Sequence, residues 1–394
     1  MNRPRIIAVH LLNDLSGSPL VFREALQVLL QQGYTVDLIT ATPSGKGFLS
    51  DIPGIRYHRL FYRWSPNRWL TLILFLCSQV SLFFRVVWEA RRKDVVYCNS
   101  MLPFGAALAG RVKGCTVIYH IHEVSIKPAI LKQWLVWVIN VTAQYCIYVS
   151  KYLRRHTAIL VEGSVIYNAL PAAFVEKCPR GETTVGGTGQ EGGGAENVFT
   201  VLMLCSLKAY KGIHEFVQCA RALPKIRFHL VLNASGQAIR QFFAGYSLPS
   251  NLCLYDAQSD THPFYAKASI VVNLSLPDQW VETFGMTILE AMYYRRPVIV
   301  PPVGGVSELV EDGVDGFCID SRDVQAVIAK IVLLSTDRAL YDRMSSKACQ
   351  KAFCFGQENF RQSIIRVIRN DYLKKNRIYE KEKDRNHRYS GDTR

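Results

Sequence analysis

Short apolar segments recur along this chain with longer amphipathic segments between them, and this alternation constrains its fold most. It predicts parallel β-strands joined by helices, that is, an α/β architecture. The predicted strands are residues 6–10, 34–40, 94–98, 115–120, 146–149 and 165–167 in the first half, and 199–205, 228–232, 268–273 and 297–300 in the second. We therefore expect two doubly wound, Rossmann-like domains.

A glycine-rich segment separates the two series. Its sequence, RGETTVGGTGQEGGGAEN over residues 180–197, has too few apolar residues to build a core, so we predict a flexible loop. The end of the chain is charged and poor in apolar residues, which is typical of disorder. The predicted organisation is an N-terminal domain over residues 1–178, a loop over 179–197, a C-terminal domain over 198–372 and a disordered tail over 373–394.

The charge and the cysteines narrow the class of protein. The formal net charge of +15 favours an anionic partner: nucleic acid, an anionic membrane surface or a phosphate-bearing substrate. We expect no nucleic acid, because no RNA-binding aromatic signature or helix-turn-helix pattern stands out. The eleven cysteines contain no C-x-x-C pair, which is typical of reduced thiols in the cytoplasm. The first residues lead directly into a predicted strand, so we expect no signal peptide.

Residues 69–84, WLTLILFLCSQVSLFF, form a strongly apolar segment. It is shorter than the roughly 20 residues that span a bilayer. Its polar members are Ser78, Gln79 and Ser81. One interpretation is a helix buried in the N-terminal domain. The other adds a basic collar that contacts anionic lipid headgroups. The collar consists of Arg59, Arg63, Arg68 and Arg85.

The C-terminal half contains an ordered series of motifs. Glu282 and Glu290, with seven residues between them, flank a Thr-Phe-Gly turn that leads into a short amphipathic segment. Carboxylates accept hydrogen bonds from sugar hydroxyls, and free amides at a helix start attract anions, so the pattern favours a nucleotide-sugar ligand. The other motifs are Leu289-Glu290-Ala291, Pro297-Val298-Ile299, Gly304-Gly305, Glu308-Leu309-Val310 and Gly313 to Gly316.

This series resembles the E-x7-E element and its surroundings in family-four glycosyltransferases, which are retaining enzymes of the GT-B fold. The resemblance covers most of the chain and is most specific in the C-terminal half. It implies an N-terminal acceptor domain and a C-terminal nucleotide-sugar domain facing a cleft, with the last helix crossing back. It also implies sugar transfer from a nucleotide-diphosphate donor, with no metal and no cofactor.

The resemblance assigns roles to individual residues. Glu290 would bind the ribose hydroxyls, and Glu282 the transferred sugar. The diphosphate would be held by backbone amides at the helix start, those of Phe284, Gly285, Met286 and Thr287. His122, followed by Glu123, resembles the family's His-Asp pair, whose histidine contacts the donor sugar. The resemblance alone favours it over His120, which lies on the same side of the predicted strand.

Two lysines, Lys208 and Lys211, lie in a predicted strand-to-helix loop. Two ammonium groups there can neutralise a diphosphate leaving group, each through charge-assisted hydrogen bonds of about 1.5–3 kcal/mol. Where the family often has an arginine this chain has Ser206, so Lys208 would replace that cation. Gly17 belongs to a loop that resembles the family's first glycine-rich loop and allows close approach of a ligand. We expect Glu282, His122 and Lys211 to be catalytic.

These features predict a glycosyltransferase, and the resemblance implies that it retains the anomeric configuration. No side chain is an obvious nucleophile, which favours a front-face mechanism in which the leaving phosphate takes the acceptor proton. The basic, apolar segment favours a polyprenyl-linked or other lipid-linked glycan acceptor at the inner face of the cytoplasmic membrane, as in bacterial surface polysaccharide assembly. The alternatives are a nucleotide-sugar epimerase or phosphorylase of the same fold, and a non-catalytic basic protein that binds lipid or nucleic acid.

Overall fold

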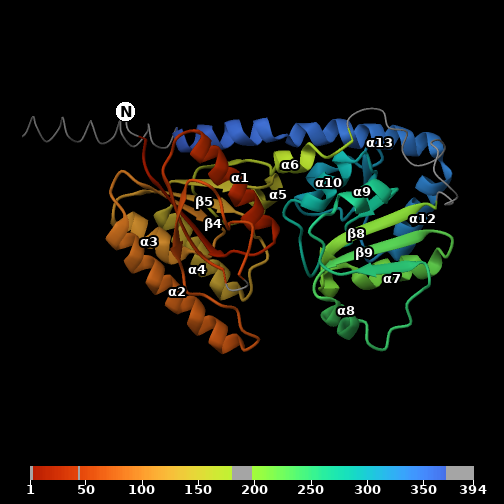
Figure 1. Cartoon of the computed structure of the whole chain (residues 1–394), viewed down its shortest axis with the longest axis horizontal. Helices are drawn as coiled ribbons and strands as arrows, with labels where there is room; N and C mark the ends of the chain where they lie inside the picture. The colour runs from red at the N-terminus through yellow and green to blue at the C-terminus, as the bar shows by residue number, and fades with distance from the viewer. Residues whose placement is uncertain (1–2, 43–44, 180–197, 370–394) are drawn as a thin grey trace, which may run out of the picture. The chain divides into compact units, whose positions relative to one another are not determined.

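The computed structural model describes residues 3–42, 45–179 and 198–369. The chain divides into two compact units, one formed by Met1–Tyr167 with Glu358–Arg394 and the other by Asn168–Gln357. Each unit is a parallel β-sheet covered by helices on both faces (Figure 1). The predicted glycine-rich loop, apart from residue 179, and the predicted tail lie outside the described residues.

The sheet of the first unit has seven strands in the order β3-β2-β1-β4-β5-β6-β7. They are β1 (Ile6–Leu12), β2 (Val36–Ala41), β3 (Ile55–Arg59), β4 (Val95–Asn99), β5 (Thr116–Ile121), β6 (Tyr145–Tyr148) and β7 (Gly163–Val165). The central strands are buried on both sides, so their sequences read as continuous apolar runs. The strand order reverses between β1 and β4, and doubly wound sheets bind ligands at the carboxyl ends of the strands at such a switch point.

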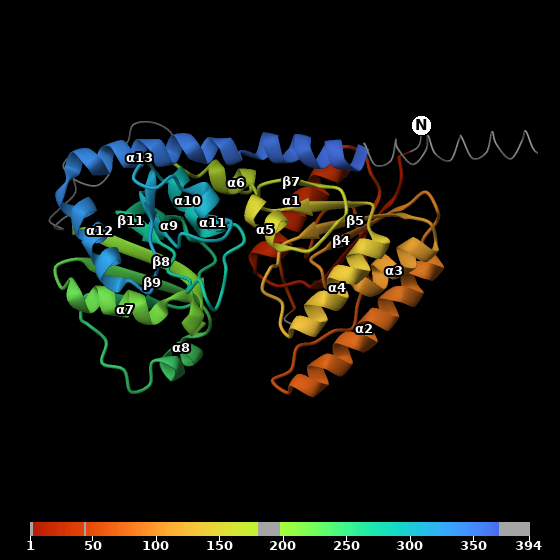
Figure 2. The same ribbon diagram turned by 180° about the vertical axis from the view of Figure 1, so that it is seen from behind.

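The helices of the first unit lie on both faces of its sheet. Their bounds are α1 (Gly17–Gln31), α2 (Arg68–Glu89), α3 (Phe104–Val112), α4 (Ala129–Thr142) and α5 (Lys151–His156). Helices α2, α3 and α4 lie side by side on one face and α1 on the other (Figures 1 and 2). Right-handed crossovers explain this, because α1 leads to a strand on the opposite side of β1 from β4. A helix over residues 357–369 belongs to this unit from residue 358 onwards and buries Phe360, Ile364, Val367 and Ile368.

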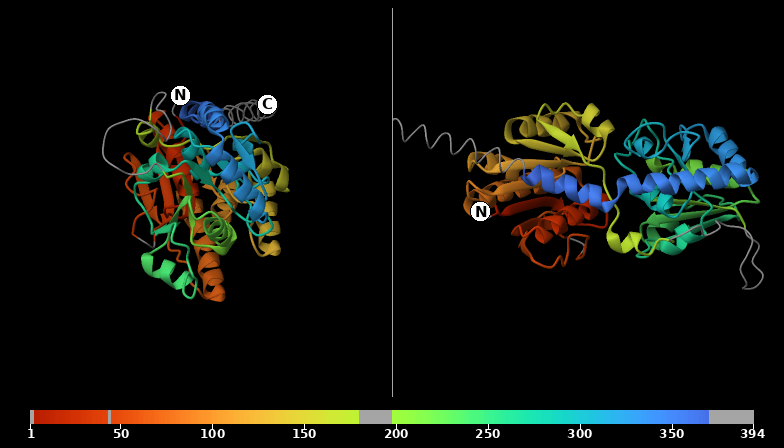
Figure 3. Two further views of the ribbon diagram at one scale, coloured as in Figure 1. Left: turned by 90° about the vertical axis from the view of Figure 1, so that its right-hand side faces the viewer. Right: turned by 90° about the horizontal axis from the view of Figure 1, so that it is seen from above.

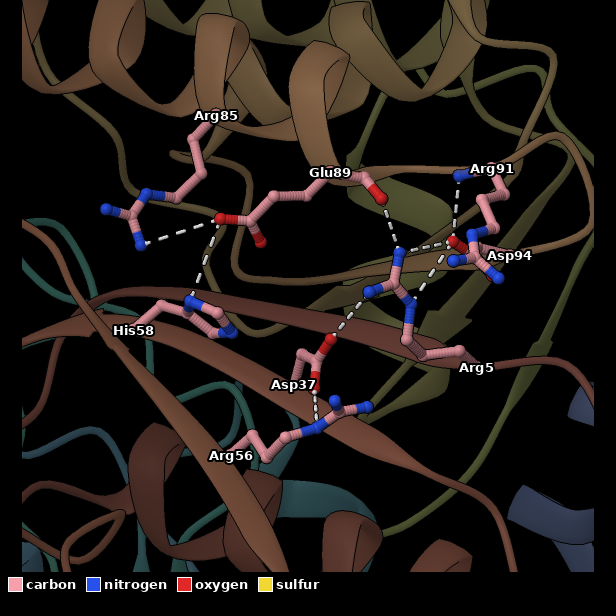
Figure 4. A network of polar contacts seen from close by, with 8 residues as sticks. All are labelled: Arg5, Asp37, Arg56, His58, Arg85, Glu89, Arg91 and Asp94. Atoms are coloured by element: carbon pink, nitrogen blue, oxygen red, sulfur yellow. Dashed lines mark hydrogen bonds and ion pairs between the residues drawn. The ribbon is translucent and has the colours of Figure 1, made fainter.

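An ion network lies at the amino ends of β1, β2 and β4 (Figure 4). The Arg5 guanidinium is 2.9 Å from an Asp37 carboxylate oxygen and 2.7 Å from one of Asp94. It also donates a hydrogen bond of 2.6 Å to the carbonyl oxygen of Glu89, the last residue of α2. The network therefore fixes the end of α2 to the sheet, at the edge opposite to the carboxyl ends of the strands.

The second unit has six parallel strands in the order β10-β9-β8-β11-β12-β13. They are β8 (Thr200–Ser206), β9 (Arg227–Asn233), β10 (Leu252–Tyr255), β11 (Ile270–Val272), β12 (Val298–Val300) and β13 (Gly316–Cys318). The strand order reverses between β8 and β11. This unit also forms the Rossmann-like arrangement, and the predicted α/β fold of two such domains is confirmed.

Helices cover both faces of the second sheet, as the side and top views also show (Figure 3). Their bounds are α6 (Ala172–Val175), η1 (Ala209–Lys211), α7 (Ile213–Ala222), α8 (Gly236–Phe242), α9 (His262–Lys267), α10 (Met286–Tyr293), α11 (Val306–Leu309), α12 (Val324–Thr336), α13 (Arg338–Ala352) and η2 (Phe353–Phe355). The core between sheet and helices contains Phe216 and Phe228, whose rings meet edge to face at 5.3 Å between centroids.

The boundary between the units differs from the expected limit at residue 178, because residues 168–178 belong to the second unit. The described helix from residue 358 onwards belongs to the first unit, in agreement with the expected crossing of the last helix. Strands β3, β10 and β13 were not among the strands predicted from the sequence. Strand β3 is a mostly exposed edge strand with basic residues, IRYHR, so it carries no apolar run.

Candidate functional site

Polar side chains gather at the carboxyl ends of the strands that flank the switch point of each sheet. In the second unit, Lys211 follows β8, and Glu282 lies in the connection after β11. In the first unit, His10 lies near the end of β1 and Asn99 ends β4. Doubly wound sheets generally bind ligands at this place, and the charged residues Lys211 and Glu282, which the sequence predicts to be functional, lie there.

Lys211 and Glu282 form an ion pair in the second unit. The Lys211 ammonium is 2.5 Å from one carboxylate oxygen of Glu282 and 3.3 Å from the other. The two side chains are only 13% and 19% exposed. The ammonium also lies 5.0 Å from the ring centroid of Trp280, which stacks on Tyr210. The cation is thus held between a carboxylate and an aromatic face before any ligand binds.

Backbone contacts fix this ion pair. Gly304 adopts a left-handed conformation with φ of 97°, and a Cβ at this position would overlap the carbonyl oxygen of Glu282. The amide of Gly305 donates a hydrogen bond of 2.8 Å to that same oxygen. On the lysine side, the amide of Leu276 donates to the Tyr210 carbonyl oxygen at 2.9 Å. The Gly304-Gly305 motif therefore holds the segment that carries Glu282.

Glu290 has a different environment from Glu282. It lies on α10, and its carboxylate accepts a hydrogen bond of 2.5 Å from the hydroxyl of Tyr265 on α9. Burial raises the pKa of Glu290 to about 7, although the bond from Tyr265 acts in the opposite direction. Tyr265 is fully buried and stacks on Tyr294, and Arg296 donates to its carbonyl oxygen at 3.0 Å. One glutamate is thus paired with a cation and the other with a hydroxyl.

The four residues predicted to hold the diphosphate, residues 284–287, lie at the start of α10 and have different surroundings. Gly285 precedes the helix with φ of 99°, and no side-chain hydrogen bond caps this helix start among the described residues. Met286 and Thr287 lie in the first turn, and backbone amides at the start of a helix attract anions. The side chain of Phe284 is buried and packs edge-on against Phe355 at 6.0 Å between ring centroids. Its side chain therefore anchors the turn.

The two predicted lysines differ in exposure. Lys211 is mostly buried in the ion pair, whereas Lys208 is exposed at the start of η1. The amide of Lys208 donates to the Ser206 carbonyl oxygen at 2.8 Å. The Lys208 ammonium is therefore more screened by solvent, and Lys211 is the better placed of the two to act on a shielded phosphate.

In the first unit Asn99 connects His122 to the start of α1. His122 Nε2 lies 2.8 Å from Asn99 Oδ1, and Asn99 Nδ2 lies 3.0 Å from His10 Nδ1 and 2.9 Å from Ser18 Oγ. An amide oxygen only accepts and an amide nitrogen only donates. In this arrangement His122 donates through Nε2 and His10 accepts through Nδ1. His122 in its neutral form then keeps a lone pair on Nδ1.

Burial keeps these imidazoles neutral. It lowers the pKa of His122 well below its ordinary value and that of His10 to about 4. His120, whose ring centroid lies 4.5 Å from that of His122, is bonded instead to the hydroxyl of Tyr97 at 3.0 Å. Burial lowers the pKa of His120 to about 3. The two histidines therefore have different partners. His122 is bonded to Asn99, whereas His120 packs in the sheet.

Gly17 lies next to Ser18, one of the residues bonded to Asn99. It is the first residue of α1, and its neighbour Ser18 accepts the hydrogen bond from Asn99. On its other side the amide and hydroxyl of Ser16 both donate to the Asp14 carboxylate, at 2.9 and 2.5 Å. The predicted loop and the predicted histidine therefore meet at the carboxyl edge of the first sheet.

Four residues at these sites were not predicted from the sequence: His10, Asn99, Tyr265 and Trp280. His10 and Asn99 could have been predicted as site residues, because each is a polar residue at the carboxyl end of a predicted apolar strand. Tyr265 could not, since its bond to Glu290 joins two helices that are brought together only by folding. Among the described residues, no group of three or more His, Cys, Asp or Glu is placed to hold a metal ion.

Comparisons with known proteins place this geometry in context. The family model described as Glycosyltransferase Family 4 matches residues 15–172, and that described as Glycosyl transferases group 1 matches residues 190–351. The chain is 30% identical over 106 residues to a D-inositol 3-phosphate glycosyltransferase of Kribbella flavida, a match that covers 27% of this chain and 24% of that protein. The match thus spans about a quarter of the relative's length.

Solved structures resemble nearly the whole chain. Alr3699/HepE of Anabaena, in complex with UDP and glucose, has a TM-score of 0.72 at 19% identity and covers 93% of this chain and 99% of its own. The apo form of the lipopolysaccharide outer core galactosyltransferase WaaB has a TM-score of 0.65 at 14% identity, with 93% and 99% covered. At these identities the likeness shows the fold alone.

Proposed function

Because the chain belongs to the family-four glycosyltransferases and has the GT-B fold, we propose that it transfers a sugar from a nucleoside-diphosphate donor to a hydroxyl group. The observation that carries this proposal is the arrangement in the second unit. Lys211 and Glu282 are paired at the switch point of the sheet, and Glu290 lies in a separate environment on α10. A cation, a sugar-binding carboxylate and a ribose-binding carboxylate match the three parts of such a donor.

In this proposal the second unit binds the donor. Glu290 accepts hydrogen bonds from the ribose hydroxyls, and the amides of residues 284–287 bind the diphosphate at the start of α10. Glu282 contacts the transferred sugar. Lys211 and the exposed Lys208 supply positive charge to the phosphates. In the first unit, His122 and the backbone at Gly17 contact substrate at the carboxyl edge of that sheet.

We propose that transfer retains the anomeric configuration through a front-face mechanism. The bond between the anomeric carbon and the phosphate oxygen breaks, and the acceptor oxygen bonds to the same face of that carbon. The acceptor proton passes to the departing phosphate. Lys211 stabilises the negative charge that develops on the diphosphate, in a site where its ammonium is already oriented by Glu282 and Trp280. The proposal requires no metal and no cofactor.

Two solved structures and one surface of the chain support the proposed donor and acceptor classes. Alr3699/HepE was solved with UDP-glucose, so UDP-sugars are the first donors to test. WaaB acts on the lipopolysaccharide outer core by its name, and this chain carries a basic, apolar surface in its first unit. We propose a glycan or polyprenyl-linked glycan acceptor in bacterial surface polysaccharide synthesis, used in the cytoplasm at the inner face of the membrane.

The test is release of nucleoside diphosphate from labelled UDP-glucose, UDP-N-acetylglucosamine and GDP-mannose, with and without a lipid extract of bacterial membranes. We expect release from one donor that depends on the extract, together with label in the lipid fraction. The variants Glu282→Gln and Lys211→Ala should lose it, whereas Glu311→Gln, which changes an exposed glutamate of the same unit, should not. Conversion of the donor into an epimer without any acceptor would overturn the transferase proposal.

A further inference from the structure

Helix α2 exposes most of its large apolar side chains and buries two polar ones. One stripe at helical spacing consists of Trp69, Ile73, Leu76, Val80, Phe84 and Trp88, all between 48% and 90% exposed. The buried stripe on the opposite side includes Ser78 and Gln79, at 1% and 2% exposure. Amphipathic helices of globular proteins normally show the reverse. The interpretation of residues 69–84 as a helix buried in the N-terminal domain is therefore wrong for most of their apolar side chains.

Neighbouring helices extend this apolar surface. Edge-to-face ring contacts run from Phe75 on α2 to Phe104 on α3, at 5.8 Å, and from Phe104 to Trp134 on α4, at 6.1 Å. Trp134 then stacks on Trp137, and these two side chains are 43% and 52% exposed. We call the exposed side chains of the α2 stripe together with Trp134 and Trp137 the α2–α4 face.

Helix α2 is long and apolar enough to cross a membrane, and it is the only such helix in the described part of the chain. Its contacts with the fold hold it along the surface instead. Gln79 accepts a hydrogen bond of 3.0 Å from the Gly105 amide, and a Cβ on Gly105 would overlap the Gln79 carbonyl oxygen. Its last residue is bonded to Arg5 in the ion network (Figure 4). Removing α2 to span a bilayer would break the first unit.

The charges around the face are almost all positive. Between residues 56 and 93 the only acidic residue is Glu89, which pairs with Arg85 and His58. Arg59, Arg63 and Arg68 are exposed near the start of α2. Helix α4 has no acidic residue. An apolar stripe with arginines at one end matches the acyl chains and anionic headgroups of a lipid surface.

We propose that the α2–α4 face docks on the surface of an anionic lipid bilayer, with α2 lying in the plane of the interface. The helix has 22 residues and is therefore about 33 Å long, and its apolar stripe from Trp69 to Trp88 covers nearly this whole length. Interfaces between proteins keep a substantial polar fraction even at their core, whereas this stripe is uniformly apolar and includes two tryptophans. Both features favour lipid over a protein partner. The proposal is independent of the donor chemistry, because docking needs no nucleotide.

Tryptophan fluorescence reports this face directly. Five of the six tryptophans lie on it or just before it, at positions 64, 69, 88, 134 and 137, and all five are exposed by 43% or more. The full chain is mixed with vesicles of phosphatidylcholine, with or without 30% phosphatidylglycerol, at low and high salt. We expect a blue shift of emission and quenching by brominated acyl chains with the anionic vesicles, weakened at high salt.

Matched variants separate the apolar and charged parts. Val80→Glu should reduce vesicle binding at least tenfold, whereas Val332→Glu, at an exposed valine on α12, should not. Replacing Arg63 and Arg68 by Gln removes two charges, and at about fivefold for each charge binding should fall roughly 25-fold. The control variant has the same change of net charge, because it replaces Arg343 and Lys347, which are exposed on α13, by Gln. Circular dichroism verifies that each variant is folded.

The outcomes distinguish the occupants of the face. Vesicle binding that is lost in Val80→Glu and in the double arginine variant, but kept in both controls, supports the proposal. Equal binding to neutral and anionic vesicles would overturn its electrostatic part. Absence of vesicle binding, with light scattering that shows a dimer which Val80→Glu dissociates, would assign the face to a second copy of the chain and overturn the proposal.

Discussion

At the scale of single residues, the two glutamates of the E-x7-E element differ in the group that each one faces. Glu282 is neutralised by the Lys211 ammonium, and Glu290 accepts a hydrogen bond from the Tyr265 hydroxyl. The spacing in sequence places Glu282 before α10 and Glu290 within it, but it does not specify these partners. Each partner comes from a distant segment, 71 residues away for Lys211 and 25 for Tyr265.

The environment of Glu290 predicts a pH dependence of stability. Its pKa in the folded protein is raised to about 7 from 4.5, so the folded state binds this proton more tightly than the unfolded state. Its contribution to stability is present below about pH 4.5 and is lost as the pH rises through 7, amounting to about 1–3 kcal/mol. The variant Glu290→Gln cannot ionise at this position, so it does not lose this stability as the pH rises. The melting temperature of Glu290→Gln relative to that of the wild type should therefore be higher at pH 8 than at pH 5.

The exposed Glu311 provides the control for that experiment. Glu311→Gln should show the same difference from the wild type at both pH values. If Glu290→Gln also behaves identically at pH 5 and pH 8, Glu290 is ionised like an exposed carboxylate and its assigned environment is wrong.

The two lysines are expected to contribute unequally to turnover. Lys211→Ala removes an oriented and largely buried ammonium, so the turnover number should fall about 100- to 1,000-fold. Lys208→Ala removes an exposed ammonium, and the loss should stay below about tenfold because solvent screens it. Steady-state rates with the preferred donor measure both. Equal losses in the two variants would contradict the distinct roles.

At the scale of elements, short glycine turns fix the strand-to-helix connections that carry the candidate site. Gly304 is held against the Glu282 carbonyl oxygen with φ of 97°. Gly313 has φ of 76°, and among the described residues no heavy atom would lie within 4 Å of a Cβ added there. The two glycines share a left-handed conformation but differ in the space around them. They therefore separate the cost of backbone conformation from the cost of a close contact.

Gly304→Ala should cost more stability than Gly313→Ala. The backbone conformation alone costs an alanine about 1–2 kcal/mol, and at Gly304 the overlap with the Glu282 carbonyl adds to it. Melting temperatures of the two variants measure the difference. Gly304→Ala should also reduce sugar transfer, because the Glu282 segment must move. Equal stability of the two variants would show that the contact at Gly304 is easily relieved.

The contact between α2 and α3 allows a similar test. Gly105→Ala should destabilise the first unit by about 1–3 kcal/mol or more, because its Cβ overlaps the backbone of α2 at Gln79. A melting temperature unchanged from the wild type would mean that α2 is free to move away from α3. It would weaken the argument that this helix lies fixed along the surface.

The sequence predicts most of the central strands because they are buried on both faces. It fails for β3, whose residues are largely exposed, and for the orientation of α2. Composition indicated that α2 is apolar, but which face it buries depends on the helix packed against it. Gly105 permits that close packing, and its role cannot be recognised before α2 and α3 are placed side by side.

At the scale of the whole molecule, the chain consists of two Rossmann-like units, and each carries polar residues at its switch point. The order of motifs predicted the family, and the residues it assigned lie at the carboxyl edges of the two sheets. The boundary between the units was less predictable, because residues 168–178 precede the glycine-rich segment but belong to the second unit. The last described helix belongs to the first unit, as the resemblance implied.

The central claim is that the second unit binds a nucleoside diphosphate through Glu290 and the start of α10. The most direct measurement is the melting temperature of the full chain with UDP, GDP, dTDP and ADP, for the wild type, Glu290→Ala and the control Glu311→Gln. Ligand that binds only the folded state raises the midpoint. We predict a rise with one nucleotide that is kept in Glu311→Gln and lost in Glu290→Ala. No rise with any nucleotide, or an equal rise in Glu290→Ala, would contradict the account.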